Sequence, residues 1–161
     1  MTIITVTRSL PSTPAQVWEV LRDIAGIENF HPVVQSSPLN AGSGPDGLGA
    51  SRTCTFYDGN HVVEEVVGWD EGRSMTIEIV DGSMPIQPGA RAHIEVTPEG
   101  TGTQVAFTMD YTVKFGPLGA VMNVLMMKRQ FAKVIDGLLA GLDVHVRTGE
   151  RIGPDFDAAA A

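Results

Sequence analysis

Few residues of this chain combine the types and spacing that acid/base chemistry requires. Only two pairs of titratable side chains suit it, His31 with Glu64 and Asp110 with Tyr111. General acid/base catalysis needs such a pair inside a cavity, but Asp110 lies opposite the apolar positions of its alternating run, so we expect it to face solvent. The sequence contains no nucleophile elbow, phosphate-binding loop or dinucleotide fingerprint. No catalytic residue is therefore assigned, and whether the protein is an enzyme stays open.

Arg52 is a further polar candidate, and its surroundings depend on which side of its run is buried. It shares parity with Cys54 and Phe56, so it points inward if Phe56 does. A buried guanidinium would need a carboxylate, either from a ligand or from Glu64 on the neighbouring run. The alternative is that Arg52 faces water at the end of its strand.

Metal and disulfide chemistry are disfavoured. Histidines occur one per predicted element, at positions 31, 61, 93 and 145, and not at metal-ligand spacing. The single cysteine, Cys54, cannot form an intramolecular disulfide and is typical of a small buried hydrophobe. His93 lies on the polar side of its run and is expected to face solvent. His31, beside Pro32, fits either a pocket mouth or an ordinary surface position. We expect no cofactor and no metal.

Composition and charge exclude several classes of partner. The 161 residues carry a formal net charge of −8 and a pI near 4.8, which disfavours nucleic acid and anionic membrane surfaces as main partners. No stretch approaches the ~20 apolar residues of a membrane span. Residues 1–10 lack a basic segment followed by an apolar one, so a cytoplasmic location is expected.

Alternation of apolar and polar residues predicts seven strands. They are a first strand at 3–9, a short one opening at 33, and runs at 50–57, 61–69, 73–80, 89–97 and 103–115. Short turns rich in Gly and Asp separate the last five runs, which indicates an antiparallel meander, because parallel pairing needs a crossover of about a dozen residues.

Helical patterns flank the strands. Thr13 followed by Pro14 predicts a helix start, and Gly26 is expected to interrupt that helix before a further short turn. After Pro117 a single helix of about 30 residues is predicted up to about Thr148. Antiparallel strands with a helix on one face define an α+β domain, in which the sheet must curl around the long helix. The domain is expected to span 1–148, with 149–161 as a frayed tail.

Several short segments occur in a characteristic order along residues 1–148. They are TPAQVW at 13–18, LRD at 21–23, FHPVV at 30–34, LGASR at 48–52, VEEVV at 63–67, MP at 84–85 and TP at 97–98. Their order resembles the START/Bet v 1-like (SRPBCC) superfamily, and within it the bacterial polyketide cyclase/dehydrase-like branch. The resemblance implies a helix-grip fold, with a cavity between sheet and long helix for lipids, hormones, polyketides or other apolar molecules. Members of that superfamily bind, catalyse or regulate, and the fold alone does not choose among these roles.

Inward-facing aromatic, Met and polar side chains are the candidates for contact with a ligand, although each apolar one can equally fill the core. The candidate ligand-binding set is Trp18, Phe30, His31, Arg52, Phe56, Glu64, Met75, Ile77, Phe107, Met109, Tyr111, Met122, Met126, Met127 and Phe131.

The first turns of the predicted long helix are apolar nearly all round, because Met122, Leu125 and Met126 project on the side that later carries charges. An exposed apolar patch marks a contact surface. Three explanations compete: a ligand portal near Met122 and Met126, a homodimer contact, or burial under the loops at 40–49 or 83–88.

The sequence thus supports three functional hypotheses. The first is the binding of a small hydrophobic or amphipathic molecule, lipid- or polyketide-like, in an internal cavity. The second is an enzyme of the cyclase, aromatase or dehydratase type. The third is an interaction or regulatory domain that uses the apolar patch.

Overall fold

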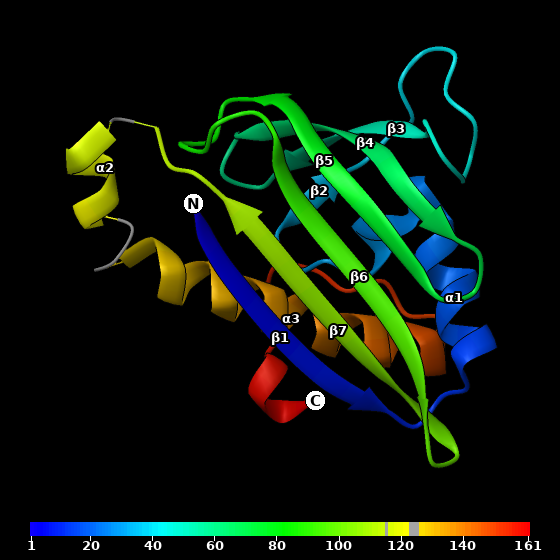
Figure 1. The fold of residues 1–161 in the computed structure, drawn as a ribbon. Coiled ribbons are helices and arrows are strands. Elements are labelled where there is room, and N and C mark those ends of the chain that lie inside the picture. The colour runs from blue at the N-terminus through cyan, green and yellow to red at the C-terminus, as the bar shows by residue number, and fades with distance from the viewer. Residues whose placement is uncertain (115, 123–125) are drawn as a thin grey trace.

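Seven strands form one curled antiparallel sheet in the order β1-β7-β6-β5-β4-β3-β2 (Figure 1). The computed structural model describes residues 1–114, 116–122 and 126–161. The strands are β1 Thr2–Leu10, β2 Val34–Ser36, β3 Ser51–Phe56, β4 His61–Asp70, β5 Ser74–Gly82, β6 Ala90–Glu99 and β7 Gly102–Tyr111. The helices are α1 Pro14–Arg22, the 3-10 helix η1 Ile24–Asn29, α2 Gly116–Met122, α3 Lys128–Thr148 and the 3-10 helix η3 Ala158–Ala160.

The sheet wraps around α3, which crosses its inner face (Figure 1). On β5, the buried side chains Met75, Ile77 and Ile79 alternate with Thr76 and Glu78, which pair in register with β6 on the outer face. The predicted α+β helix-grip architecture and all seven strands are confirmed, with ends that move by a few residues. The last strand ends at Tyr111, four residues before the end of its predicted run.

Helix α1 begins where the sequence predicts. The Thr13 hydroxyl accepts a hydrogen bond from the Gln16 backbone N–H at 3.4 Å, and the Gln16 side chain accepts one from the Thr13 N–H at 2.9 Å. This capping box satisfies two of the free N–H groups at the helix start. The helix ends earlier than expected, because Asp23 is extended, and Gly26 lies within η1.

The prediction of a single helix after Pro117 is wrong. The structure has two helices, and α2 does not continue the axis of α3 (Figure 1). Leu118 and Val121 on α2 are exposed, so α2 lacks the packing against the sheet that supplies most helical stability in proteins. The 21-residue α3 ends at Gly149, whose left-handed backbone lets its N–H donate to the His145 carbonyl.

The tail after Gly149 differs from the frayed end that the sequence predicts. Ile152 is 5% exposed, and its backbone N–H donates to the Asn29 carbonyl at 2.8 Å. Arg151 donates to the Gln35 carbonyl at 3.0 Å and lies 3.6 Å from the Glu28 carboxylate. The tail is therefore fastened to η1 and β2.

Gly141 should be required where α3 passes η1, whereas Gly137 should not. A Cβ at Gly141 would overlap the Phe30 carbonyl oxygen, while a Cβ at Gly137 would meet only the Pro32 Cγ at 3.7 Å. We expect Gly141→Ala to lower the free energy of unfolding by about 1–3 kcal/mol through overpacking. Gly137→Ala should leave it unchanged or raise it by up to about 1 kcal/mol through helix propensity.

Urea denaturation of both variants and the wild type measures these changes. Equal effects of the two substitutions would contradict the close approach of η1 to α3.

Candidate functional site

An internal cavity of about 580 Å³ lies between the inner face of the sheet and α3. Its size falls in the range of small-molecule sites, which is about 300–1,000 Å³. Apolar side chains from β3 to β7, from α3 and from η1 form most of its wall. They include Leu21, Ile27, Phe30, Phe56, Met75, Ile77, Ala92, Ile94, Phe107, Met109, Phe131, Leu138 and Leu142.

The cavity opens where its lining residues become exposed. Val33, Tyr57, Asp58 and Gln130 are exposed wall residues, so the opening lies between the β3–β4 turn, the start of α3 and the segment before β2. Exposed Pro154 adds the tail after α3 to this rim. The opening is thus bordered by four segments that are distant in sequence.

The sequence predicts the cavity opening near Met122 and Met126, and this position is only approximately right. Met127 lines the cavity near the opening, but Met126 is 66% exposed and is not part of the wall. The side chain of Met122 and all of Leu125 lie outside the described residues.

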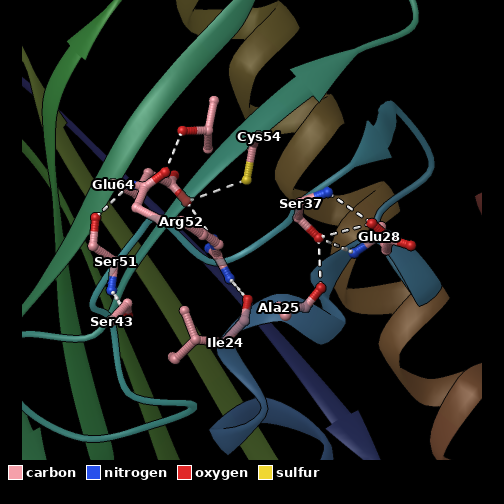
Figure 2. A network of polar contacts seen from close by, with 11 residues as sticks. Ile24, Ala25, Glu28, Ser37, Ser43, Ser51, Arg52, Cys54 and Glu64 are labelled. Atoms are coloured by element: carbon pink, nitrogen blue, oxygen red, sulfur yellow. Dashed lines mark hydrogen bonds and ion pairs between the residues drawn. The ribbon is translucent and has the colours of Figure 1, made fainter.

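A cluster of polar side chains forms one part of the cavity wall (Figure 2). Arg52 on β3 lies opposite Glu64 on β4. Its Nε donates to Glu64 Oε2 at 2.7 Å, and its terminal nitrogen donates to the Ile24 carbonyl at 2.6 Å. The Cys54 thiol donates to the same Glu64 oxygen at 3.5 Å. Arg52 is 4% exposed, so the inward orientation is confirmed and Glu64 is its carboxylate partner.

The protonation states of this cluster follow from burial and from the ion pair. Burial acts to lower the pKa of Arg52, but its interactions with Glu64 and Cys54 together outweigh burial and the pKa is raised, so the guanidinium keeps its charge. Burial raises the pKa of the Cys54 thiol, and the negative Glu64 raises it further. Cys54 is therefore an unreactive thiol.

His31 lines the cavity as a neutral imidazole. Burial, followed by the positive charge of Arg52, lowers its pKa from 6.5 to about 3. Its Nδ1 accepts a hydrogen bond from the Val33 N–H at 3.4 Å, so the ring proton resides on Nε2. The sequence allowed either a pocket mouth or an ordinary surface position for His31, and in the structure its side chain belongs to the cavity wall.

A second polar network holds η1 against β2 (Figure 2). The buried Ser37 hydroxyl donates to the Ala25 carbonyl at 2.6 Å, and the Ser37 N–H donates to Glu28 Oε2 at 2.7 Å. Together with the bond from Arg52 to Ile24, these contacts fix η1 as one wall of the cavity. Sequence reasoning missed Ser37 and Glu28, because no periodic pattern marks a contact between a 3-10 turn and a three-residue strand.

Most of the predicted site residues come together in the cavity. Those in its wall are Phe30, His31, Arg52, Phe56, Glu64, Met75, Ile77, Phe107, Met109, Met127 and Phe131. Trp18 instead packs against Trp69, with ring centroids 5.1 Å apart, and donates to Glu71. Tyr111 is buried edge-on against Phe131, outside the wall. Contact of the lining residues with a ligand stays a prediction.

Asp110 and His93 are not site residues. Asp110 lies in register with exposed Ile3 and Arg91 on the outer face of the sheet, so it does not pair with Tyr111 in the cavity. His93 is exposed as predicted, and its Nδ1 hydrogen-bonds to the Thr76 hydroxyl at 2.9 Å. Across the described residues, no group of three or more His, Cys, Asp or Glu side chains is placed to hold a metal ion.

Several wall residues escaped the sequence analysis. Met84 and Ile86 belong to the β5–β6 loop, where no alternation exists to indicate an inward face. Ala92 and Ile94 lie on β6, and the alternation of that run was the signal that could have identified them. Within the described part of the chain, no helix has the length and apolar character needed to cross a bilayer.

The curled sheet, the cavity and the long α3 together form the helix-grip fold that the sequence predicts. More narrowly, the sequence model of the family described as "polyketide cyclase / dehydrase and lipid transport" matches residues 1–147, and the chain belongs to that family. The predicted resemblance is thereby confirmed. None of the curated proteins compared with the chain matches it in sequence.

Solved structures share the fold at low sequence identity. A protein of Thermus thermophilus has a TM-score of 0.77 at 19% identity, over 92% of this chain and 99% of that one. A START superfamily protein from Mycobacterium smegmatis has a TM-score of 0.73 at 13% identity, over 90% and 97%. Major latex-like protein 151 from Panax ginseng has a TM-score of 0.67 at 17% identity, over 89% and 96%.

The neutral state of His31 should make stability depend on pH. Below about pH 6.5 the unfolded chain binds a proton at this side chain, whereas the folded chain does so only near pH 3. The contribution of His31 is therefore to lower the free energy of unfolding as the pH falls between these values, by at most about 1.4 kcal/mol per pH unit.

His31→Gln should flatten this part of the profile, measured by urea denaturation at a series of pH values. His93→Gln, on the outer face of the sheet, is the matched control and should keep the wild-type slope. A slope that survives in His31→Gln would show that other groups cause it.

Proposed function

We propose that this protein binds a small hydrophobic or amphipathic molecule, lipid- or polyketide-like, in its internal cavity. The observation that carries the proposal is the cavity of about 580 Å³, whose wall is mostly apolar and whose deeper polar side chains gather in one cluster. An apolar void of this size forgoes many dispersion contacts, which a bound apolar molecule would restore. The family description, which includes lipid transport, supports the same function. The proposed ligand-binding domain spans residues 1–148.

Binding should respond to the volume of the cavity. Ala92 lines the cavity on β6, whereas Ala106 on β7 pairs with exposed Thr7 and Glu95 on the outer face. We expect wild-type protein to bind the neutral fluorescent probe N-phenyl-1-naphthylamine saturably. Ala92→Phe should weaken this binding by at least about tenfold, since the ring occupies space that the probe needs.

Ala106→Phe introduces the same ring on the other face and should leave the affinity within about twofold. Fluorescence titration of the three proteins, after denaturation curves show them folded, measures the difference. Native mass spectrometry of gently purified protein should also detect a co-purified ligand. Absence of saturable binding, or equal affinities in all three proteins, would remove the proposal.

An enzyme of the cyclase, aromatase or dehydratase type is a second candidate, because Glu64 and His31 both line the cavity. A titratable pair inside the cavity is the arrangement that acid/base catalysis requires. However, the Glu64 carboxylate is engaged by Arg52, and a pKa of about 3 makes His31 a weak base. Binding is therefore the better supported function.

A contact surface on α2 is a third candidate. Leu118 is 71% exposed, Val121 57% and Met126 66%, and such side chains favour association with another protein surface. If they form a homodimer contact, sedimentation velocity should show concentration-dependent association, and Leu118→Glu should abolish it. Ile3→Glu, at an exposed apolar position on β1, should leave it intact. A monomer at every concentration would eliminate the dimer.

The cytoplasmic location expected from the sequence remains a proposal.

A further inference from the structure

The polar cluster lies well inside the cavity, away from its opening. Arg52 precedes Tyr57 at the opening by five residues along β3, and Glu64 follows Asn60 by four along β4. At about 3.3 Å per residue, the ion pair lies roughly 13–17 Å from the turn. Apolar side chains such as Met75, Ile77 and Phe107 line the space around it. A molecule that fills the cavity therefore contacts a mostly apolar wall and this polar cluster.

The charges of the polar cluster cancel. Arg52 is paired with Glu64 at 2.7 Å, and His31 is neutral because burial and the charge of Arg52 lower its pKa to about 3. Cys54 is a thiol, since burial raises its pKa. A charged head group that entered the cavity would lose its hydration without finding an uncompensated opposite charge, which is unfavourable.

Hydrogen-bonding capacity nevertheless remains. Arg52 and Cys54 both donate to Glu64 Oε2, and no group among the described residues donates to Oε1. The described part of the chain contains no sealed side-chain oxygen or nitrogen without a partner, so Oε1 is open to the cavity. By the same reasoning, the Nε2–H of His31 is accessible as a donor. Glu64 can thus accept one hydrogen bond from a ligand, and His31 can donate another from its own part of the cavity wall.

We propose that the cavity selects a ligand with a neutral, hydrogen-bonding head group, such as an alcohol or a phenol. The hydroxyl donates to Glu64 Oε1, and a carbonyl elsewhere on the ligand accepts from His31 Nε2. The apolar body extends toward the opening. Carboxylates, phosphates and amines of the same shape are discriminated against. This inference rests on the proposed function and deepens it.

Three probes of one shape test the inference in wild-type protein. They are biphenyl-4-ol, biphenyl-4-carboxylate and biphenyl itself, with affinities measured by calorimetry or by displacement of N-phenyl-1-naphthylamine at neutral pH. We expect biphenyl-4-ol to bind at least about tenfold more tightly than the carboxylate, and more tightly than biphenyl, because only the phenol satisfies the cluster without adding charge.

Glu64→Gln makes the cluster positively charged, since it leaves the Arg52 guanidinium without its counter-ion. The ratio of carboxylate to phenol affinity should then rise by at least about tenfold. Glu78→Gln is the matched control: Glu78 accepts from Arg91 Nε at 2.8 Å between β5 and β6, in an ion pair outside the cavity. That variant should keep the wild-type ranking.

The outcomes separate the inference from the function on which it rests. If biphenyl-4-carboxylate binds as tightly as biphenyl-4-ol, or if biphenyl binds best, the inference is overturned while the apolar cavity stands. If none of the three probes binds, the proposed function fails and takes the inference with it. If Glu64→Gln does not fold, the wild-type ranking still decides, because it requires no substitution.

Discussion

The ion pair between Arg52 and Glu64 connects the parts of this structure on which the cavity depends. Through its second hydrogen bond, to the Ile24 carbonyl, Arg52 also ties β3 to the start of η1. Removing charges from water is costly, and the cost is repaid here by a short ion pair with further hydrogen bonds. Together with burial, the charges of the pair set the protonation states of Cys54 and His31. One interaction thereby sets both a wall of the cavity and the electrostatics inside it.

Close contacts hold η1 in position as that wall of the cavity. Gly141 lets α3 pass against the carbonyl of Phe30 at the end of η1, and Ser37 binds the other side of η1 to β2. Side chains on the inner face of the curled sheet line the cavity as well. These packed segments surround the interior, and apolar side chains line it without filling it.

The sequence predicted those features that leave a periodic or local signal. Alternation placed the seven strands, and the parity of Arg52 with Phe56 indicated the inward ion pair with Glu64 as one of the alternatives. The Thr13-Pro14 start marked α1. The single long helix was predicted wrongly, because apolar spacing does not reveal whether a sheet lies beneath the helix, and none lies beneath Leu118. Met84 and Ile86 lie in a loop without periodicity, and Ile152 is one apolar residue without a stripe. Such contacts exist only between segments distant in sequence.

The contacts between the tail and η1 connect the last residues of the chain to a wall of the cavity. Ile152 and Arg151 hold the same 3-10 turn that Arg52 and Ser37 hold from the other side. Pro154 of the same tail lines the cavity directly. The residues after Gly149 therefore belong to the boundary of the cavity.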